Sequence, residues 1–214
     1  MPGTLYHLVF AEEVYKRLVP IQKMDKISFM CGNLIPDLAT DKEHSHYRKN
    51  ASVEGFFVPE IEAVKKDLFC LNNPIYFGMY THLYLDHYFI EEFLLRQFIW
   101  DLKNRMVINP RNHKKWDAKT FFSNDGMYGA YTSINHLILK DGLISKDLLD
   151  QIPAILPPTG IPLFDTRRSK TWKQELEEYF AQKKEYTGDI FDYSILCEHI
   201  QKIANQLIEE ILVS

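Results

Sequence analysis

The sequence contains few cysteines and no hydrophobic run long enough to cross a membrane. Its three cysteines, Cys31, Cys70 and Cys197, are far apart, and no CxxC pair occurs. This argues against a disulfide framework and a thiolate metal site, and favours a reducing compartment. No apolar stretch reaches about 20 residues, and the first residues show no basic region followed by an apolar block. We therefore expect a cytoplasmic protein without a transmembrane segment.

Several functional signatures are also absent. The sequence has no Gly-rich phosphate loop, no GxSxG motif and no internal repeat. The formal net charge of -4 gives no nucleic-acid signature. What the chain has is 46% hydrophobic content over 214 residues, which is enough for one substantial core. We expect a single helical domain over residues 1–214, with packing helices in 127–214.

Residues 73–104 predict one long helix. Asn73 can cap it, Pro74 suits its first turn, and no further proline interrupts it. At 1.5 Å per residue such a helix would be roughly 45 Å long, so other helices must pack around it. We therefore expect an all-α fold, a multi-helix bundle around this central helix.

Within this helix, Gly78, His82 and Asp86 are spaced by four and lie on successive turns of one face. Apolar and aromatic residues surround them, which predicts a buried helix. A glycine in mid-helix indicates close approach of another element. The buried His82 and Asp86 need partners, which leaves two interpretations open: a shared divalent cation, or a direct hydrogen bond between the two side chains.

Other candidate ligands lie N-terminal to this helix. His7 falls in the first turn of a helix expected from Leu5 to about Val19, capped by Thr4. Asp37 follows Pro36, which favours extended backbone before it and so presents Asp37 from a stiff turn. Each also has a plain alternative, a partly exposed histidine and a turn aspartate that caps its own backbone.

His44 and His46 lie in the polar segment from Leu38 to Ser52. In an extended loop, residues i and i+2 face the same way, so both imidazoles could reach one site. Alternating histidines in a polar loop are more often solvated. Which of the two would serve as a ligand, or whether both would, stays open at this point.

Four pieces of sequence carry a family resemblance when taken in order: His7, Gly32-Asn-Leu-Ile-Pro-Asp37, Ser45-His46-Tyr47 and Gly78-Met-Tyr-Thr-His82-Leu-Tyr-Leu-Asp86. Together they resemble the zinc-dependent phospholipase C family, whose all-helical fold is shared with secreted zinc-dependent single-strand nucleases. The resemblance covers about the N-terminal half, with the motifs in residues 1–105.

The resemblance implies a metal site with zinc as cofactor. Asp37, His46, His82 and Asp86 would bind one ion, and Asp86 would bridge to a second ion that His7 also binds. Removal of Met1, expected when proline follows, would make the Pro2 amine a further ligand. The implied reaction is attack of zinc-activated water on phosphorus, with Asp37 as the catalytic residue that orients the water or accepts its proton.

The sequence departs from the family pattern at a third zinc site. The histidine expected six residues after Asp86 is Glu92, and His136, the nearest candidate for a further ligand, is followed four residues later by Lys140. We therefore expect two ions and not three. His136 is interpreted as a structural or surface residue, His87 as a packing or second-sphere residue, and His199 as an edge-packing residue.

Three functions follow as hypotheses. The first is a metal-dependent hydrolase of phosphoric esters, a phospholipase C-like phosphodiesterase, acting on a small phosphate ester or a phospholipid, where a basic side chain such as Arg167 could help to hold phosphate. The second is a catalytically degraded helical metal-binding or scaffold protein of the same fold. The third is an HD-type phosphohydrolase, although its adjacent His-Asp dyad is absent because the order here is Asp86-His87.

Overall fold

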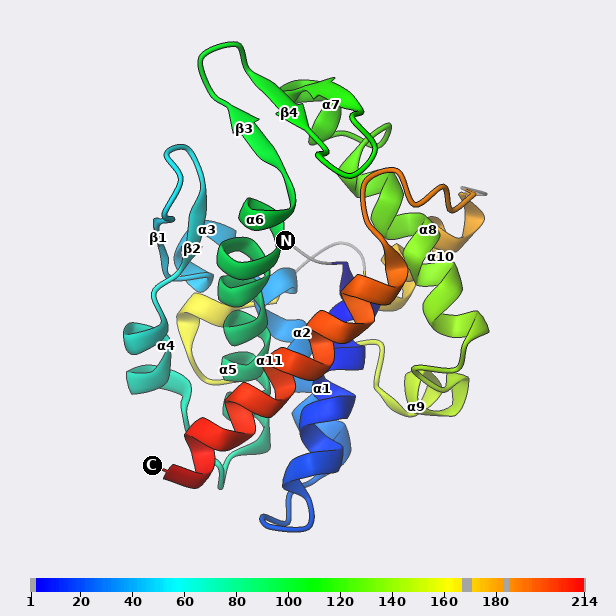
Figure 1. Cartoon of the computed structure of the whole chain (residues 1–214). Helices are drawn as coiled ribbons and strands as arrows, with labels where there is room; N and C mark the ends of the chain where they lie inside the picture. The colour runs from blue at the N-terminus through cyan, green and yellow to red at the C-terminus, as the bar shows by residue number, and fades with distance from the viewer. Residues whose placement is uncertain (1–2, 167–170, 183–184, 214) are drawn as a thin grey trace.

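The computed structural model describes residues 3–166, 171–182 and 185–213. These residues form a mostly helical domain with two small sheets (Figure 1), which confirms the expected helical class. The helices are α1 (Thr4–Leu18), α2 (Lys26–Leu38), α3 (Lys42–Ser45), α4 (Ile61–Leu68), α5 (Pro74–Tyr88), the π-helix η1 (Phe89–Leu94), α6 (Leu95–Gln97), α7 (Ala118–Phe121), α8 (Met127–Lys140), α9 (Lys146–Gln151), the 3-10 helix η2 (Pro162–Phe164), α10 (Trp172–Ala181) and α11 (Tyr193–Val213). None of the described helices is both long and apolar enough to span a membrane.

The predicted 73–104 helix is wrong in its last seven residues, 98–104. Asn73 does cap α5, since its side chain accepts a hydrogen bond from the Tyr76 amide. The helical run then passes through η1 and ends at Gln97, and the chain continues as strand β3 (Ile99–Asp101). Pairing with the next strand along the chain takes these residues into a sheet, and the strand preference of Ile99 and Trp100 supports this pairing. Asp101 accepts a hydrogen bond from the Asn104 amide in the turn that follows.

Short antiparallel strands replace part of what the sequence predicted as loop. Strands β3, β4 (Met106–Ile108) and β5 (Lys115–Asp117) form one sheet in that order, so the 105–125 connection is more structured than expected. Strands β1 (Arg48–Asn50) and β2 (Phe57–Pro59) form a separate hairpin. Both project from the helical body at the same end of the molecule (Figure 1).

Helices α2 and α5 pack at very close range through two glycines. A Cβ at Gly78 would lie 2.2 Å from the Phe29 carbonyl oxygen, and a Cβ at Gly32 would lie 2.1 Å from the Ile75 carbonyl oxygen. This confirms the close approach indicated by Gly78. The contact places the C-terminal turns of α2 beside the middle of α5, where the candidate ligands lie.

The expected extended turn before Asp37 is wrong, because α2 continues through Pro36 to Leu38. Pro36 lacks the amide that would donate to the preceding turn, and only two residues of the helix follow it. Packing against α5 therefore overrides the local preference of Ile35 for extended backbone, and Asp37 is held on a helix.

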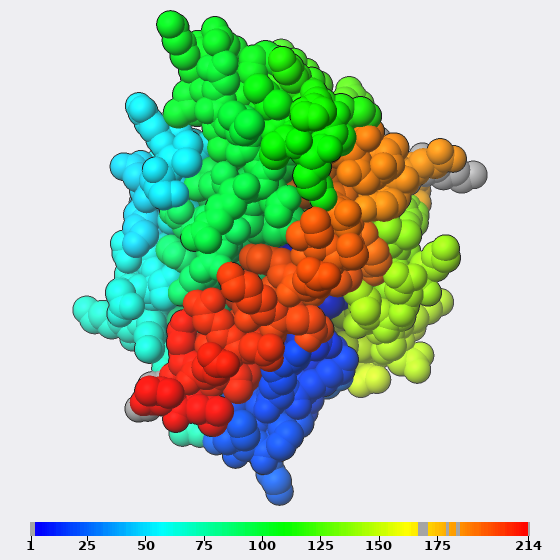
Figure 2. All heavy atoms as spheres, viewed as in Figure 1, coloured from blue at the N-terminus to red at the C-terminus, as the bar shows by residue number. Residues whose placement is uncertain are grey.

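The remaining helices cover this pair. Helix α1 packs on α2, α5, α8 and α11, and it begins at Thr4 with Gly3 as its N-cap, one residue earlier than predicted. Helices α1 and α11 lie side by side on one face of the molecule (Figure 2). The first helix therefore brings His7 to the α2–α5 contact.

Candidate metal centre

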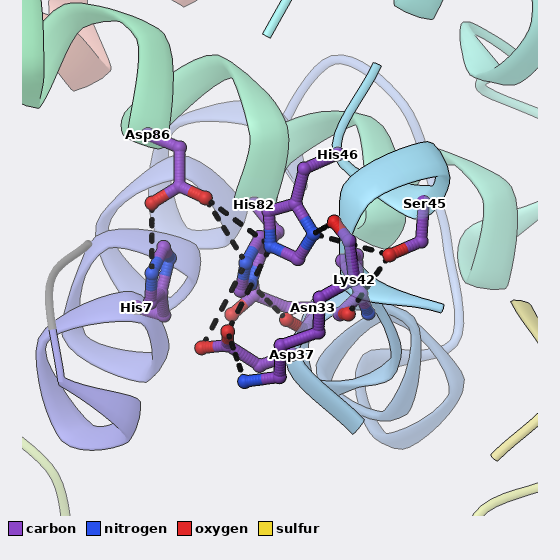
Figure 3. Close-up of polar contacts among 9 residues, drawn as sticks. His7, Asn33, Asp37, Lys42, Ser45, His46, His82 and Asp86 are labelled. Carbon is purple, nitrogen blue, oxygen red and sulfur yellow. Dashed lines mark hydrogen bonds and ion pairs between the residues drawn. The ribbon is translucent and has the colours of Figure 1, made fainter. Parts of the chain in front are cut away.

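Five predicted ligands converge at one place in the structure (Figure 3). His7 comes from α1, Asp37 from α2, His46 from the residue after α3, and His82 and Asp86 from α5. Four are almost fully buried, whereas the Asp37 side chain is 22% exposed. The structure thus gathers side chains from four separate helices into one cluster.

The Asp86 carboxylate lies at the centre of the cluster. Its Oδ1 lies 3.4 Å from His7 Nε2, and its Oδ2 lies 3.5 Å from His82 Nε2 and 3.6 Å from His46 Nε2. These distances exceed the roughly 2.7–3.2 Å of N–H···O hydrogen bonds. They match instead the separation between neighbouring ligand atoms around a tetrahedral ion, about 3.3–3.6 Å for bonds of 2.0–2.2 Å.

The Asp37 carboxylate completes the cluster from the opposite side. Its Oδ1 lies 3.7 Å from His46 Nε2, and its Oδ2 lies 3.9 Å from His82 Nε2. The Lys42 ammonium lies 3.4 Å from Oδ1. Two sets of ligand atoms each fall within 4.8 Å of one another, His46–His82–Asp86 and His7–Asp37–His82, so these residues could hold a metal ion.

The ligand atoms have no other partner among the described residues. The Nε2 atoms of His7, His46 and His82 and both carboxylate oxygens of Asp86 are buried without a hydrogen bond. Each such group costs free energy unless something satisfies it. The donor set fits a divalent cation, and the direct His82–Asp86 hydrogen bond left open by the sequence does not form.

Two of the imidazoles are held in the orientation that ligation requires. His82 Nδ1 lies 2.7 Å from the Asn33 carbonyl oxygen, and His46 Nδ1 lies 2.9 Å from the Lys42 carbonyl oxygen. Each Nδ1–H donates to its carbonyl, which leaves the Nε2 lone pair directed into the cluster. The Ser45 hydroxyl lies 3.1 Å from His46 Nδ1 and restrains the same ring.

The protonation states of His7, His46 and the two carboxylates suit a metal site, whereas metal binding at His82 would have to displace a proton. Burial lowers the pKa of His46 to about 4 and lowers the pKa of His7, so both imidazoles are neutral near pH 7. Although burial alone would raise the pKa of Asp37, the adjacent His82 and Lys42 lower it to about 2. Likewise, burial opposes ionisation of Asp86, but the neighbouring His7 and His82 hold its pKa well below its usual range. For His82, the carboxylate of Asp86 outweighs burial and raises the pKa.

Of the histidine pair in the 38–52 segment, only His46 reaches the cluster. The segment is not extended, because Asp41 caps the short helix α3 and turns His44 outward. The exposed His44 Nδ1 lies 2.7 Å from Asp41 Oδ2. Of the possibilities that the sequence left open, the structure places His46 in the cluster and His44 outside it.

The remaining predicted positions lie away from the cluster. Glu92 pairs with Lys202, and His136 Nε2 lies 3.4 Å from the Gln182 carbonyl oxygen. His87 contacts the Pro59 carbonyl through Nδ1, and His199 is buried with its Nδ1 3.3 Å from the Tyr6 hydroxyl. No third group of ligands forms among the described residues. Pro2 and Arg167 lie outside them.

A cavity of about 840 Å³ opens beside the cluster. Its wall includes His7, Asp37 and His82. Basic and apolar side chains from the two hairpins and adjoining segments line other parts of it, namely Lys42, Arg48, Arg105, Phe57, Trp100 and Leu102. The candidate ligands are therefore reachable from a space large enough for a small organic molecule.

Two further residues of this wall were missed by sequence reasoning. Asn33 lies four residues before Asp37 on α2, so recognising that helix would have placed the two on one face. Tyr131 lies on α8, and nothing in its spacing relates it to the ligands. Both side chains line the cavity and are buried.

Comparisons of the chain with protein-family models, with curated proteins and with solved structures gave no match. The class of the molecule is therefore defined by its own geometry. It is a helical domain with a buried cluster of three histidines and two aspartates that could hold a metal ion beside an open cavity.

Proposed function

We propose that this protein is a metal-dependent hydrolase of phosphoric esters, with zinc as its cation. The observation that carries the proposal is the cluster of buried, mutually unpaired imidazole and carboxylate atoms at the wall of the cavity. Imidazole and carboxylate are the usual ligands of hydrolytic zinc. The ordered motifs that resemble zinc-dependent phospholipase C support the same reaction.

We propose that the cluster holds two ions. Asp86 presents one oxygen to His7 and the other to His46 and His82. A shared carboxylate of this kind can hold two ions about 3.5–4 Å apart, the spacing that clamps a phosphate. When bound, the cations would acidify water and neutralise negative charge on phosphoryl oxygens.

The chain's own groups would position the reactants. Asp37 is the ligand most exposed to the cavity, and its low pKa keeps it ionised as a hydrogen-bond acceptor. It is thereby suited to orienting a water molecule towards phosphorus. Lys42, Arg48 and Arg105 line the same cavity together with Glu54, Asp101 and Glu175, and these three basic groups would contact the phosphate. The apolar side chains of the hairpins would accept the organic part of a phosphate ester or phospholipid.

The proposal is tested by metal content and hydrolysis measured on the same preparation. Protein purified without chelator or affinity metal should contain about two zinc ions per chain by plasma mass spectrometry. It should release p-nitrophenol from bis(p-nitrophenyl) phosphate or p-nitrophenyl phosphate, or diacylglycerol from phosphatidylcholine vesicles. Chelation should abolish the activity and zinc should restore it. Fully loaded protein that hydrolyses none of these esters would refute the proposal.

One observation favours a catalytically silent metal-binding scaffold as the second candidate. Glu92 is engaged with Lys202, and His136 contacts a backbone carbonyl, so neither contributes a further ligand. Zinc binding without hydrolysis of the esters above would support this candidate. The HD-type alternative gains nothing from the geometry, because His87 turns to Pro59 while Asp86 faces the cluster.

A further inference from the structure

Two polar side chains in the cavity wall are buried without a partner and are not metal ligands. The Tyr131 hydroxyl and both polar atoms of the Asn33 side chain have no hydrogen bond to any described residue. Tyr131 is 7% exposed and Asn33 is fully buried. Because proteins rarely leave such groups unsatisfied, each calls for an explanation.

The Tyr131 ring is held rigidly. It stacks on Phe191 with a centroid separation of 5.3 Å and an interplanar angle of 19°, and it packs against Phe89 at 6.2 Å. A Cβ added at Gly3 would lie 3.5 Å from the Cβ of Tyr131. Tyr131 therefore packs against the start of α1, the helix that carries His7. These contacts fix the position of the ring in the cavity wall.

The wall formed by α8 is neutral. Four α8 residues line the cavity, and none carries a carboxylate or an imidazole: Tyr128, Tyr131, Thr132 and Asn135. This wall cannot hold a cation, but its phenol is a hydrogen-bond donor. Across the cavity, the Asn33 amide lies on α2 next to the turn that carries Asp37.

We infer that the Tyr131 hydroxyl and the Asn33 amide donate hydrogen bonds to an oxygen of the phosphate group bound in this cavity. The inference rests on the proposed function, since it names how that site would hold its substrate. A phosphate oxygen accepts several hydrogen bonds, and a fixed, buried donor pays little to form one. The Tyr131 hydroxyl comes from the α8 wall, which carries no charged side chain, and the Asn33 amide comes from α2, one turn before Asp37.

The test compares Tyr131→Phe with wild type and with Tyr15→Phe. The control removes a tyrosine hydroxyl on α1 that contacts the Met24 carbonyl and does not line the cavity. Each protein is loaded with zinc, freed of excess metal, and titrated with inorganic phosphate by calorimetry. We expect Tyr131→Phe to bind phosphate about 10-fold more weakly with unchanged zinc content, and Tyr15→Phe to bind it like wild type. Asn33→Ala, which keeps the backbone carbonyl that orients His82, should weaken binding similarly.

A second readout separates a binding role from a structural one. Because the Tyr131 hydroxyl has no partner in the described structure, its removal should leave the thermal midpoint of the chelated protein unchanged or raised. A lowered midpoint with unchanged phosphate affinity would overturn the inference and leave the proposed function standing. Zinc-loaded wild type that neither binds phosphate nor hydrolyses any ester would overturn both.

Discussion

Replacing Asp86 by asparagine is the sharpest perturbation of the candidate metal centre. The two carboxylate oxygens of Asp86 face different histidines: Oδ1 faces His7, and Oδ2 faces His46 and His82. Asn keeps the size of the side chain, but it loses the charge and offers one oxygen in place of two. The substitution therefore weakens the contacts of residue 86 with three histidines, while α5 keeps its packing.

The expected change in melting temperature follows from the linkage between zinc binding and folding. Zinc present at about 1,000 times its dissociation constant stabilises the folded state by about 4 kcal/mol. For a chain of 214 residues, where 1 kcal/mol shifts the melting temperature by about 2–4 °C, this corresponds to roughly 8–16 °C. Loss of a shared ligand should weaken binding at least about 100-fold, because outer-sphere changes alone cost 10–100-fold. The remaining shift is then about 1.4 kcal/mol, or roughly 3–6 °C.

The assay is differential scanning calorimetry of each variant with zinc and with EDTA, supported by metal analysis. The matched control is Asp147→Asn, which neutralises an exposed carboxylate on α9 outside the cluster. It should keep the full zinc-dependent shift. If Asp86→Asn keeps both the shift and the metal content of wild type, then Asp86 is not a ligand and the bridging geometry has been misinterpreted.

Three further predictions test separate parts of the structure. His46→Ala should lose zinc while His44→Ala should keep it, as measured by metal analysis, because only His46 reaches the cluster; equal losses would contradict the assignment. Gly78→Ala should lower the free energy of unfolding in urea by about 3 kcal/mol, since its Cβ would meet α2 backbone at 2.2 Å and this overrides the better helix propensity of alanine. Burial lowers the pKa of His199 to about 4 from 6.5, so the unfolded chain binds a proton between these pH values and the folded one does not. Stability should therefore fall by up to about 3 kcal/mol as pH drops through this window. In urea titrations, His199→Gln should reduce that slope by the share of one histidine, because His7 and His46 titrate in the same direction; an unchanged slope would contradict the assignment.

The sequence was most informative where spacing on one helix decides geometry. The four-residue spacing of Gly78, His82 and Asp86 correctly predicted one buried face and a close approach to a second helix. The ligand set was predictable only as a set. No single position distinguished His46 from His44, because the choice depends on a one-turn helix capped by Asp41.

The errors arose where tertiary contacts override local preference. Pro36 indicated the end of a helix, yet packing on α5 carries α2 past it. The residues after Gln97 continued a helical pattern, yet pairing with β4 takes them into a sheet. Tyr131 could not be found from the sequence at all, since it comes from a helix packed against α1 and only the folded chain brings it to the cavity.

The way the ligands are supported implies that the site exists before any cation binds. His7, Asp37, His82 and Asp86 all project from helices whose packing is apolar and independent of the cluster. His46 is tied to the backbone of α3, and its neighbour Ser45 donates to the Pro36 carbonyl, which anchors that turn to α2. A cation would thus add stability to a fold already formed, unlike small zinc domains that are unfolded without metal. Without a cation, the buried candidate ligand atoms lack hydrogen bonds, which destabilises the fold. The close contact between α2 and α5 at Gly32 and Gly78 holds these atoms in place. Chelation should consequently lower the melting temperature while leaving the helical circular dichroism spectrum intact.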